Sequence, residues 1–289
     1  MKKLYLFLFS LLFFSFLIFI LGNYFFGDQE KYLNEHIENT YIEPNIPVKK
    51  IEEIEKNIEE EKNNLTEEEK EKIKIILKSA YNIKFIYYPA SFNATILDYT
   101  YSFKAFLNSI YVKNKIKDLK IELYKEKNDV RGRMKDRSIK MFGVQEMKVS
   151  EFNSVGIHEF AHFIDLYFFE KEIFTDISDY FYNISWDGTK ILKPGLKQLD
   201  FVSGYAMTNK YEDFAESFTY FILHNGDFFK KSNDSENLKQ KYMFFTKYLF
   251  MNKEFLKTDF SIGNKVKPYY RDITKIDFSL ENFLEFMKK

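Results

Sequence analysis

The 289-residue sequence contains no cysteine, and it has only 10 glycines, 5 prolines and one tryptophan. The absence of cysteine excludes thiol nucleophiles, cysteine-ligated metal sites, disulfide frameworks and lipoprotein anchors. An excess of one charge is also lacking, because 43 Lys and Arg balance 43 Asp and Glu. Since nucleic-acid-binding proteins normally carry a strong basic excess, we expect no nucleic-acid partner.

Apolar and aromatic residues are abundant instead. Hydrophobic residues make up 45% of the chain and aromatic residues 19%, with 34 Phe and 21 Tyr. This composition predicts a folded chain with a substantial core rather than a disordered one. The length suits one medium domain, or one domain with a small appendage.

The first 27 residues are typical of an export signal. Lys2 and Lys3 precede an apolar run over residues 4–21, and no acidic residue occurs before Asp28. About 18 apolar residues is long for a cleaved signal and short for a membrane span. Residues 22–27 contain no small-residue cleavage motif, which favours an uncleaved membrane anchor over secretion after cleavage. Both alternatives place the rest of the chain outside the cytoplasm.

The remaining chain divides into a connecting segment and a main domain. Residues 28–80 form a polar linker followed by a Glu/Lys-rich helical segment, and the main domain covers 81–289. Short apolar runs predict strands at 83–88, 119–124 and 139–144, with a helix over 94–115. From residue 151 the pattern is mainly helical. The expected fold class is therefore α+β, a small mixed sheet followed by a helical half, preceded by an N-terminal hydrophobic helix.

A His-Glu-x-x-His motif at residues 158–162 carries the strongest chemical signal. On a helix, His158 and His162 lie one turn apart on the same face, so both imidazoles can converge on one metal ion. Glu159 lies at the edge of that face, where it can reach a metal-held water. A catalytic zinc needs three protein ligands and one open position. By itself, however, the motif occurs by chance in roughly one such chain in two hundred.

A second pair of acidic residues raises the significance of this motif. Glu212 and Glu216 are also spaced i, i+4 in a helical stretch that runs to about His224. Such a pair is usually a solvated helix face. Combined with the histidine helix, Glu212 is the expected third ligand, and Glu216 is expected to accept the free N–H of a ligating histidine.

Other polar residues have more ordinary interpretations. His224 ends an apolar helix and is expected to be structural, and His36 lies in the linker. Asp165 either orients a histidine or caps the helix. The three arginines between residues 131 and 137 favour a solvated turn over a site for an acidic substrate.

The two blocks resemble the lethal-factor-like catalytic domain, which is found in anthrax lethal factor and in smaller bacterial Pro-Pro endopeptidases. The similarity covers residues 81–250 and is carried by HEFAHFID at 158–165, Tyr205, Thr208-Asn209, Glu212 and AESF at 215–218. It implies a zincin-like fold of gluzincin type. It also implies that His158, His162 and Glu212 hold one Zn²⁺ per chain, with Glu159 as general base and Tyr205 as a hydrogen-bond donor in the transition state.

The chain departs from this family in two respects. Ala161 replaces a glycine of lethal factor, and a chain of this length has no counterpart to that toxin's other domains. Toxin activity and the toxin's substrate therefore do not carry over, and Pro-Pro specificity, which depends on loops in the related small enzymes, is not assigned.

The expected function is that of an extracytoplasmic zinc endopeptidase with a peptide or protein substrate. The strand expected at 139–144 could pair with an extended substrate. Two alternatives stay open, a non-catalytic zinc-containing surface binding module and an anchored scaffold with a fortuitous motif.

Overall fold

A computed structural model of the chain describes residues 84–88, 101–103, 105–107, 119–169, 176–251, 254–262 and 271–287. All of these residues belong to one compact unit, residues 46–289. The predicted hydrophobic helix of 1–27 and the linker and helical segment of 28–80 lie outside the described residues, as does most of the helix predicted at 94–115. Among the helices described, none combines the length and the apolar character that crossing a membrane requires.

The expected mixed sheet is present and has four strands in the order β1-β2-β4-β3. The strands are β1 (Lys84–Tyr88), β2 (Lys120–Tyr124), β3 (Gly132–Lys135) and β4 (Ser138–Phe142). The first three neighbours in the sheet, β1, β2 and β4, run parallel, whereas β3 is antiparallel to β4. Three of these strands match the apolar runs of the sequence, and β3 was not predicted.

The order of the strands corrects one expectation about substrate binding. The strand predicted at 139–144 is β4, which pairs with β2 on one side and with β3 on the other. Both of its edges are occupied by main-chain hydrogen bonds, so β4 cannot accept an added strand. Among the strands that the structure describes, the outer strand on this side of the sheet is β3.

The turn between β3 and β4 contains Arg137, one of the three arginines expected in a turn, and its two residues have an unusual backbone conformation. Asp136 and Arg137 have φ angles of 50° and 58°, the left-handed values that a two-residue hairpin turn requires. The Arg137 guanidinium lies 4.5 Å from the ring centroid of Tyr167, and the Arg137 carbonyl accepts a hydrogen bond from the Lys120 amide. The contacts with Tyr167 and Lys120 thus stabilise left-handed φ angles that aspartate and arginine adopt less readily than glycine.

The helical half follows the sheet, and the structure is a mixed α+β fold as expected. Its long helices are α5 (Val149–Phe163), α6 (Ile177–Ser185), α7 (Lys210–Leu223), α8 (Asn225–Ser232), α9 (Glu236–Tyr248) and α10 (Leu280–Met287). A π-helical turn, η4 (Ile164–Phe168), extends α5. Short 3-10 turns are η3 (Val144–Glu146), η5 (Gln198–Asp200), η6 (Tyr205–Met207) and η7 (Ile273–Lys275). Strands β5 (Trp186–Gly188) and β6 (Ile191–Leu192) form a small hairpin.

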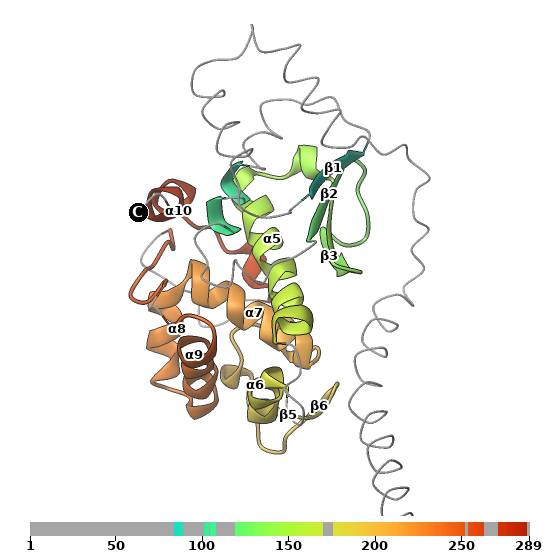
Figure 1. Cartoon of the computed structure of the whole chain (residues 1–289). Helices are drawn as coiled ribbons and strands as arrows, with labels where there is room; N and C mark the ends of the chain where they lie inside the picture. Colours follow the sequence, from blue (N-terminus) through green and yellow to red (C-terminus); the bar gives the residue numbers. More distant parts are fainter. Residues whose placement is uncertain are drawn as a thin grey trace, which may run out of the picture. The chain divides into compact units, whose positions relative to one another are not determined.

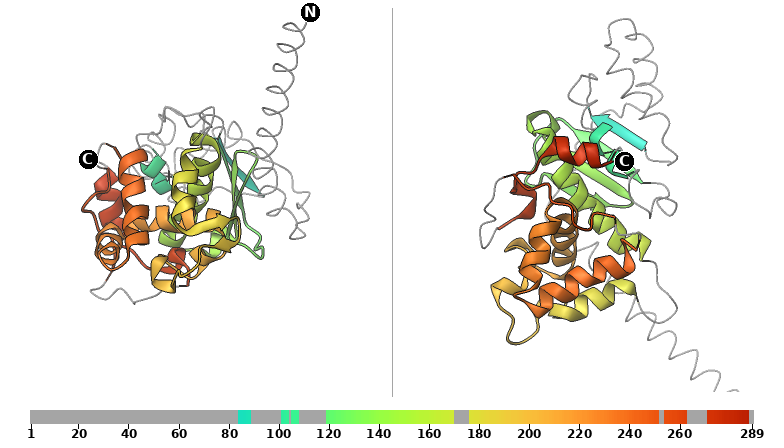
Figure 2. Two further views of the ribbon diagram at one scale, coloured as in Figure 1. Left: turned by 90° about the horizontal axis from the view of Figure 1, so that it is seen from below. Right: turned by 90° about the vertical axis from the view of Figure 1, so that its left-hand side faces the viewer.

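Helix α5 lies between the sheet and the other long helices (Figures 1 and 2). It contacts β3 and β4 on one side and packs along α7 on the other. Every residue of α7 is buried. The two central helices are therefore shielded from solvent over most of their length, and side chains on their facing surfaces meet in the interior.

Aromatic side chains fill the space between α7, α6 and α9. Phe214 of α7 has its ring centroid 5.2 Å from that of Phe181 and 5.5 Å from that of Phe245, in edge-to-face arrangements. Such pairs are favoured by the quadrupoles of the rings in addition to their buried area. A buried ion pair lies among them, with Lys241 Nζ 2.7 Å from Asp213 Oδ2. The high phenylalanine content thus builds the core that supports α7.

Candidate metal centre

Helix α5 carries the two histidines on its buried surface. His158 and His162 are 6% and 3% exposed, and their ring centroids lie 5.0 Å apart at an interplanar angle of 82°. The spacing of four residues therefore brings the rings together as the sequence predicted. Glu159 lies between them in the sequence and is also buried.

Helix α7 supplies the acidic residues, and its first turn is fixed by Asn209. The Asn209 side chain accepts hydrogen bonds from the amides of Tyr211 and Glu212 at 2.9 and 3.0 Å. This is an N-cap, which satisfies two of the free N–H groups at the start of the helix. Glu212 thus lies in the first turn and Glu216 one turn later, both facing α5.

The donor atoms of His158, His162 and Glu212 converge on one point. Glu212 Oε2 lies 3.1 Å from His158 Nε2 and 3.5 Å from His162 Nε2, and the three ligand atoms lie within 4.8 Å of one another. Two ligands at about 2.05 Å from a tetrahedral zinc are separated by about 3.3 Å. The observed separations match this value, and two imidazoles with a carboxylate are a donor set that suits zinc. This buried triad could hold a metal ion.

Glu216 contacts His158 from the opposite side of the ring. Its Oε1 lies 3.1 Å from His158 Nδ1, while its Oε2 accepts hydrogen bonds from the Ser203 hydroxyl at 2.6 Å and from the Ile273 amide at 2.8 Å. The carboxylate is fully buried. Glu216 is therefore held by two donors and faces the ring nitrogen that would not ligate the metal, as predicted for a residue that orients a ligand.

The electrostatic surroundings of His158 are strongly anionic. Burial alone lowers the pKa of this imidazole, but the hydrogen bonds and charges of Glu212 and Glu216 outweigh that effect and raise the pKa well above 6.5. Two carboxylates held against one histidine in a buried space are costly unless a cation balances them. A divalent ion at the triad would supply that charge.

Tyr205 lies beside this cluster in the turn η6. Its ring centroid is 6.1 Å from that of His158, and the side chain is 40% exposed, so it is not a buried core aromatic. The charge of Glu212, burial and the charge of Glu159 all raise the pKa of the Tyr205 hydroxyl. The hydroxyl therefore stays protonated at neutral pH and can donate a hydrogen bond.

Sequence reasoning missed the residues that hold the cluster together. Ser203 donates to Glu216 and accepts a hydrogen bond from the Ala206 amide at 3.0 Å, which links Glu216 to the turn that carries Tyr205. The Arg271 carbonyl accepts a hydrogen bond from the Tyr205 amide at 2.6 Å. A serine or a backbone group leaves no motif in a sequence, so only the fold identifies these contacts.

Three other predicted residues lie away from the triad. His224 is buried, with Nδ1 2.7 Å from the Ser261 hydroxyl, and burial lowers its pKa to about 4, in agreement with a structural role. Asp165 was expected to orient a histidine or to cap the helix, and its carboxylate accepts hydrogen bonds from Ser178 and Tyr182 of α6. Burial raises the pKa of Asp165 to about 7.

Arg131 was expected in a solvated turn, and it instead bridges three segments. Its guanidinium lies 3.0 Å from Glu151 Oε1 of α5 and 2.9 Å from Asp272 Oδ2, and it donates to the Thr274 hydroxyl at 2.6 Å. These contacts tie the residue before β3 to α5 and to η7.

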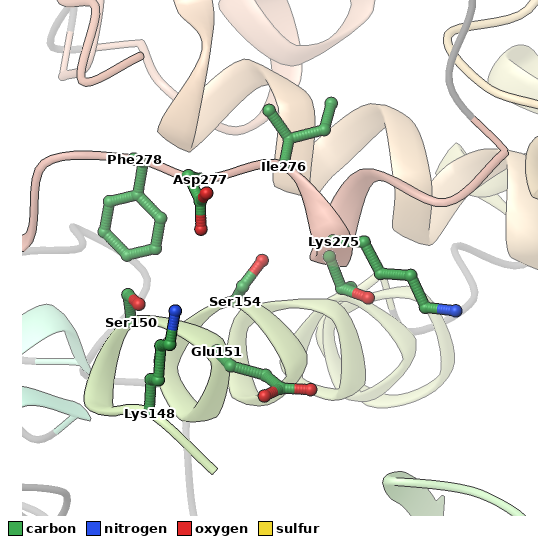
Figure 3. Close-up of a pocket in the computed structure, with 9 residues that line it drawn as sticks. Lys148, Ser150, Glu151, Ser154, Lys275, Ile276, Asp277 and Phe278 are labelled. Carbon is green, nitrogen blue, oxygen red and sulfur yellow. The ribbon is translucent and has the colours of Figure 1, made fainter. Parts of the chain in front are cut away.

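A pocket of about 250 Å³ lies at the first turns of α5, and it does not include the triad (Figure 3). Its lining residues are Lys148, Ser150, Glu151, Ser154, Thr274, Lys275, Ile276, Asp277 and Phe278. Figure 3 shows Asp277 and Phe278, which follow η7, directed toward α5, and Lys148 and Ser154 directed toward that segment. Two lysines and two acids line it, so the pocket has no excess of charge.

Comparison of the chain with protein-family models, with curated proteins and with solved structures gives no match.

Proposed function

We propose that the protein is a zinc-dependent endopeptidase that acts outside the cytoplasm. The observation that carries the proposal is the convergence of His158 Nε2, His162 Nε2 and Glu212 Oε2 in a buried space, with separations that suit a tetrahedral ion. Three protein ligands leave one position for water, which is the arrangement of a catalytic rather than a structural zinc site.

Each residue around the triad has a role in peptide hydrolysis. Bound zinc lowers the pKa of a water molecule and polarises the substrate carbonyl. Glu159 would accept the proton of the attacking water and pass it to the leaving amine. Tyr205, whose hydroxyl stays protonated, would donate a hydrogen bond to the oxyanion that develops. Glu216 would keep the proton of His158 on Nδ1, so that Nε2 faces the metal.

The open edge of β3 is the proposed binding surface for the substrate. β3 follows Arg131 directly, contacts α5 and pairs only with β4 among the described strands. An extended peptide could add to this edge through main-chain hydrogen bonds, which recognise any sequence that is extended. The proposed substrate class is therefore an extended segment of a peptide or protein.

The resemblance to the lethal-factor-like catalytic domain supports the same proposal. The motif positions of that family fall on α5, η6 and α7, which here form one cluster. On this basis we propose the gluzincin arrangement within a zincin-like fold, and an N-terminal segment that either anchors the protein or is removed on secretion.

The proposal is tested with the purified full chain. We expect about one zinc per chain by elemental analysis, and cleavage within a peptide library that a chelator abolishes and zinc restores. Glu159→Gln should keep the zinc and lose cleavage by about 100-fold or more, because general-base catalysis contributes ~10²–10⁴-fold. His162→Ala should lose both zinc and cleavage.

Glu151→Gln is the matched control, since it makes the same chemical change about two turns away on α5 at a partly exposed ion pair. Glu151→Gln should retain both the bound zinc and the peptide cleavage. One zinc per chain with no cleavage of any peptide would favour the non-catalytic binding module instead. A chain that binds no zinc would refute the proposal.

A further inference from the structure

The first residue of β3 lies directly against the proposed general base. Gly132 pairs with Met141 of β4, and its Cα hydrogen faces α5. A Cβ atom at this position would lie 2.7 Å from Glu159 Cγ, 2.7 Å from Glu159 Oε1 and 2.7 Å from Val155 Cγ1. Non-bonded carbon atoms normally approach to about 3.5–4.0 Å. The position therefore has no room for a side chain.

The backbone at Gly132 does not itself require glycine. Among the described glycines, only Gly143 and Gly195 have left-handed φ angles, of 67° and 84°. Gly132 has a conformation that an L-residue can adopt, so an alanine would not strain its main chain. What excludes a side chain at Gly132 is the space taken by Glu159 and Val155.

Of these two neighbours, Glu159 is the one that can yield. Val155 is β-branched and lies inside α5, where one χ1 rotamer is strongly preferred. Glu159 has an unbranched side chain with three rotatable bonds, so its carboxylate would move first. We propose that Gly132 is a positioning residue, which brings the edge strand close to α5 and lets the Glu159 carboxylate lie against the strand that holds the substrate. The inference rests on the proposed function, in which Glu159 is the general base.

The proposal predicts a selective loss of turnover. Relieving a 2.7 Å contact to an ordinary separation would displace the Glu159 carboxylate by about 1 Å, and a displacement of this size can lower the rate by about 100-fold. The triad lies on the facing surfaces of α5 and α7 and is not among the atoms that the added methyl group would meet. Gly132→Ala should therefore lower kcat by about 100-fold, with KM changed by less than about threefold and zinc content unchanged.

Gly188→Ala provides a matched control. Gly188 also lies in a short strand, and a Cβ there would meet only the flexible end of Ile191, at 3.3 Å. This variant should keep its kcat, KM and zinc content. If Gly132→Ala keeps its kcat, or if it raises KM and lowers zinc content together, Gly132 does not position Glu159.

A second experiment tests the contact without any activity. Gly132→Ala is made both in the wild-type chain and in the Glu159→Ala variant, and thermal unfolding is measured at equal zinc loading. Overpacking should lower the Tm of the wild-type chain by several degrees. In the Glu159→Ala background more than half of that loss should disappear, because Glu159 supplies two of the three atoms nearest to the added methyl group, while the contact with Val155 remains.

Equal losses of Tm in both backgrounds would overturn the proposal. If Gly132→Ala alone does not fold, folding of the double variant supports the contact, and failure of both refutes it. Because this double-mutant cycle needs no substrate, it tests the contact of Gly132 with Glu159 even if the wild-type chain cleaves no peptide. Absence of cleavage would count against the proposed function, whereas equal losses of Tm would count against the role of Gly132.

Discussion

Replacing Glu216 by glutamine changes the protonation of His158 while keeping the shape of the side chain. In the native site, Oε2 of Glu216 accepts from the Ile273 amide, and that amide can only donate. In Glu216→Gln the amide oxygen must therefore take the place of Oε2, which turns the NH₂ group toward His158 Nδ1. A donor at this place requires Nδ1 to be the acceptor, and the imidazole proton then moves to Nε2, the nitrogen that faces Glu212 and His162.

The size of the effect follows from this tautomer change. A histidine with its proton on Nε2 must give up that proton before Nε2 can ligate a metal. If the proton returns to Nδ1, the contact between Nδ1 and the glutamine NH₂ group is lost. Outer partners of ligating histidines are typically worth ~10–100-fold in metal affinity, or about 1.4–2.7 kcal/mol. We expect a loss of zinc affinity in this range. The metal-free protein should lose only the stability that the charge of Glu216 gives to protonated His158, because both donors to Oε2 keep their acceptor.

Competition with a chromophoric chelator measures the zinc affinity, and thermal unfolding of the metal-free forms measures stability. Glu236→Gln makes the same change in the exposed first turn of α9 and should alter neither property. Glu216→Ala should additionally lose about 1–3 kcal/mol of metal-free stability, since it leaves buried donors without an acceptor. A glutamine variant that binds zinc as tightly as the wild type would refute the assignment of Glu216 as the orienting residue.

Three further predictions concern the fold. Burial lowers the pKa of His224 to about 4, so the folded state resists protonation, whereas the unfolded state takes up a proton near pH 6.5. The free energy of unfolding should therefore fall by about 3 kcal/mol between pH 6.5 and pH 4, relative to His224→Asn. Urea titrations in which the two proteins show parallel pH curves would contradict this prediction. Lys241→Met leaves Asp213 buried without its partner and should cost about 3–5 kcal/mol in denaturant unfolding, part of which Asp213→Leu should restore; a variant as stable as the wild type would show that the pair is dispensable. Gly156→Ala places a Cβ 2.8 Å from Phe103 and should cost about 1–3 kcal/mol with no loss of zinc, and a joint loss of both would contradict the separation of this contact from the site.

The histidine pair of the triad could be predicted because its spacing is local. His158 and His162 are four residues apart on one helix, whereas Glu212 was expected beside them only from its pairing with Glu216 and from the motif resemblance. Strands β2 and β4 are short runs with every or nearly every residue buried, so their apolar composition reveals them. In both cases the signal lies within a few consecutive residues.

Strand β3 could not be predicted for a corresponding reason. Of its four residues only Met134 is buried, so the strand has no alternation of apolar and polar residues. Its turn has Asp136 and Arg137 where Asn-Gly would be the usual signal. Because β3 was hidden, β4 was wrongly expected to accept the substrate, and the contact of Gly132 with Glu159 could not be anticipated.

The hydrogen bond from the Ile273 amide to Glu216 joins residues that are 57 positions apart, and it orders events during synthesis. Both ligand-bearing helices leave the ribosome before residue 273 does, since chains emerge from their N-terminus. Until then the Glu216 carboxylate lacks one donor, and the Tyr205 turn lacks the Arg271 carbonyl. A chain that ends before residue 271 therefore contains His158, His162 and Glu212 but lacks two of the hydrogen bonds that hold Glu216 and the Tyr205 turn beside them.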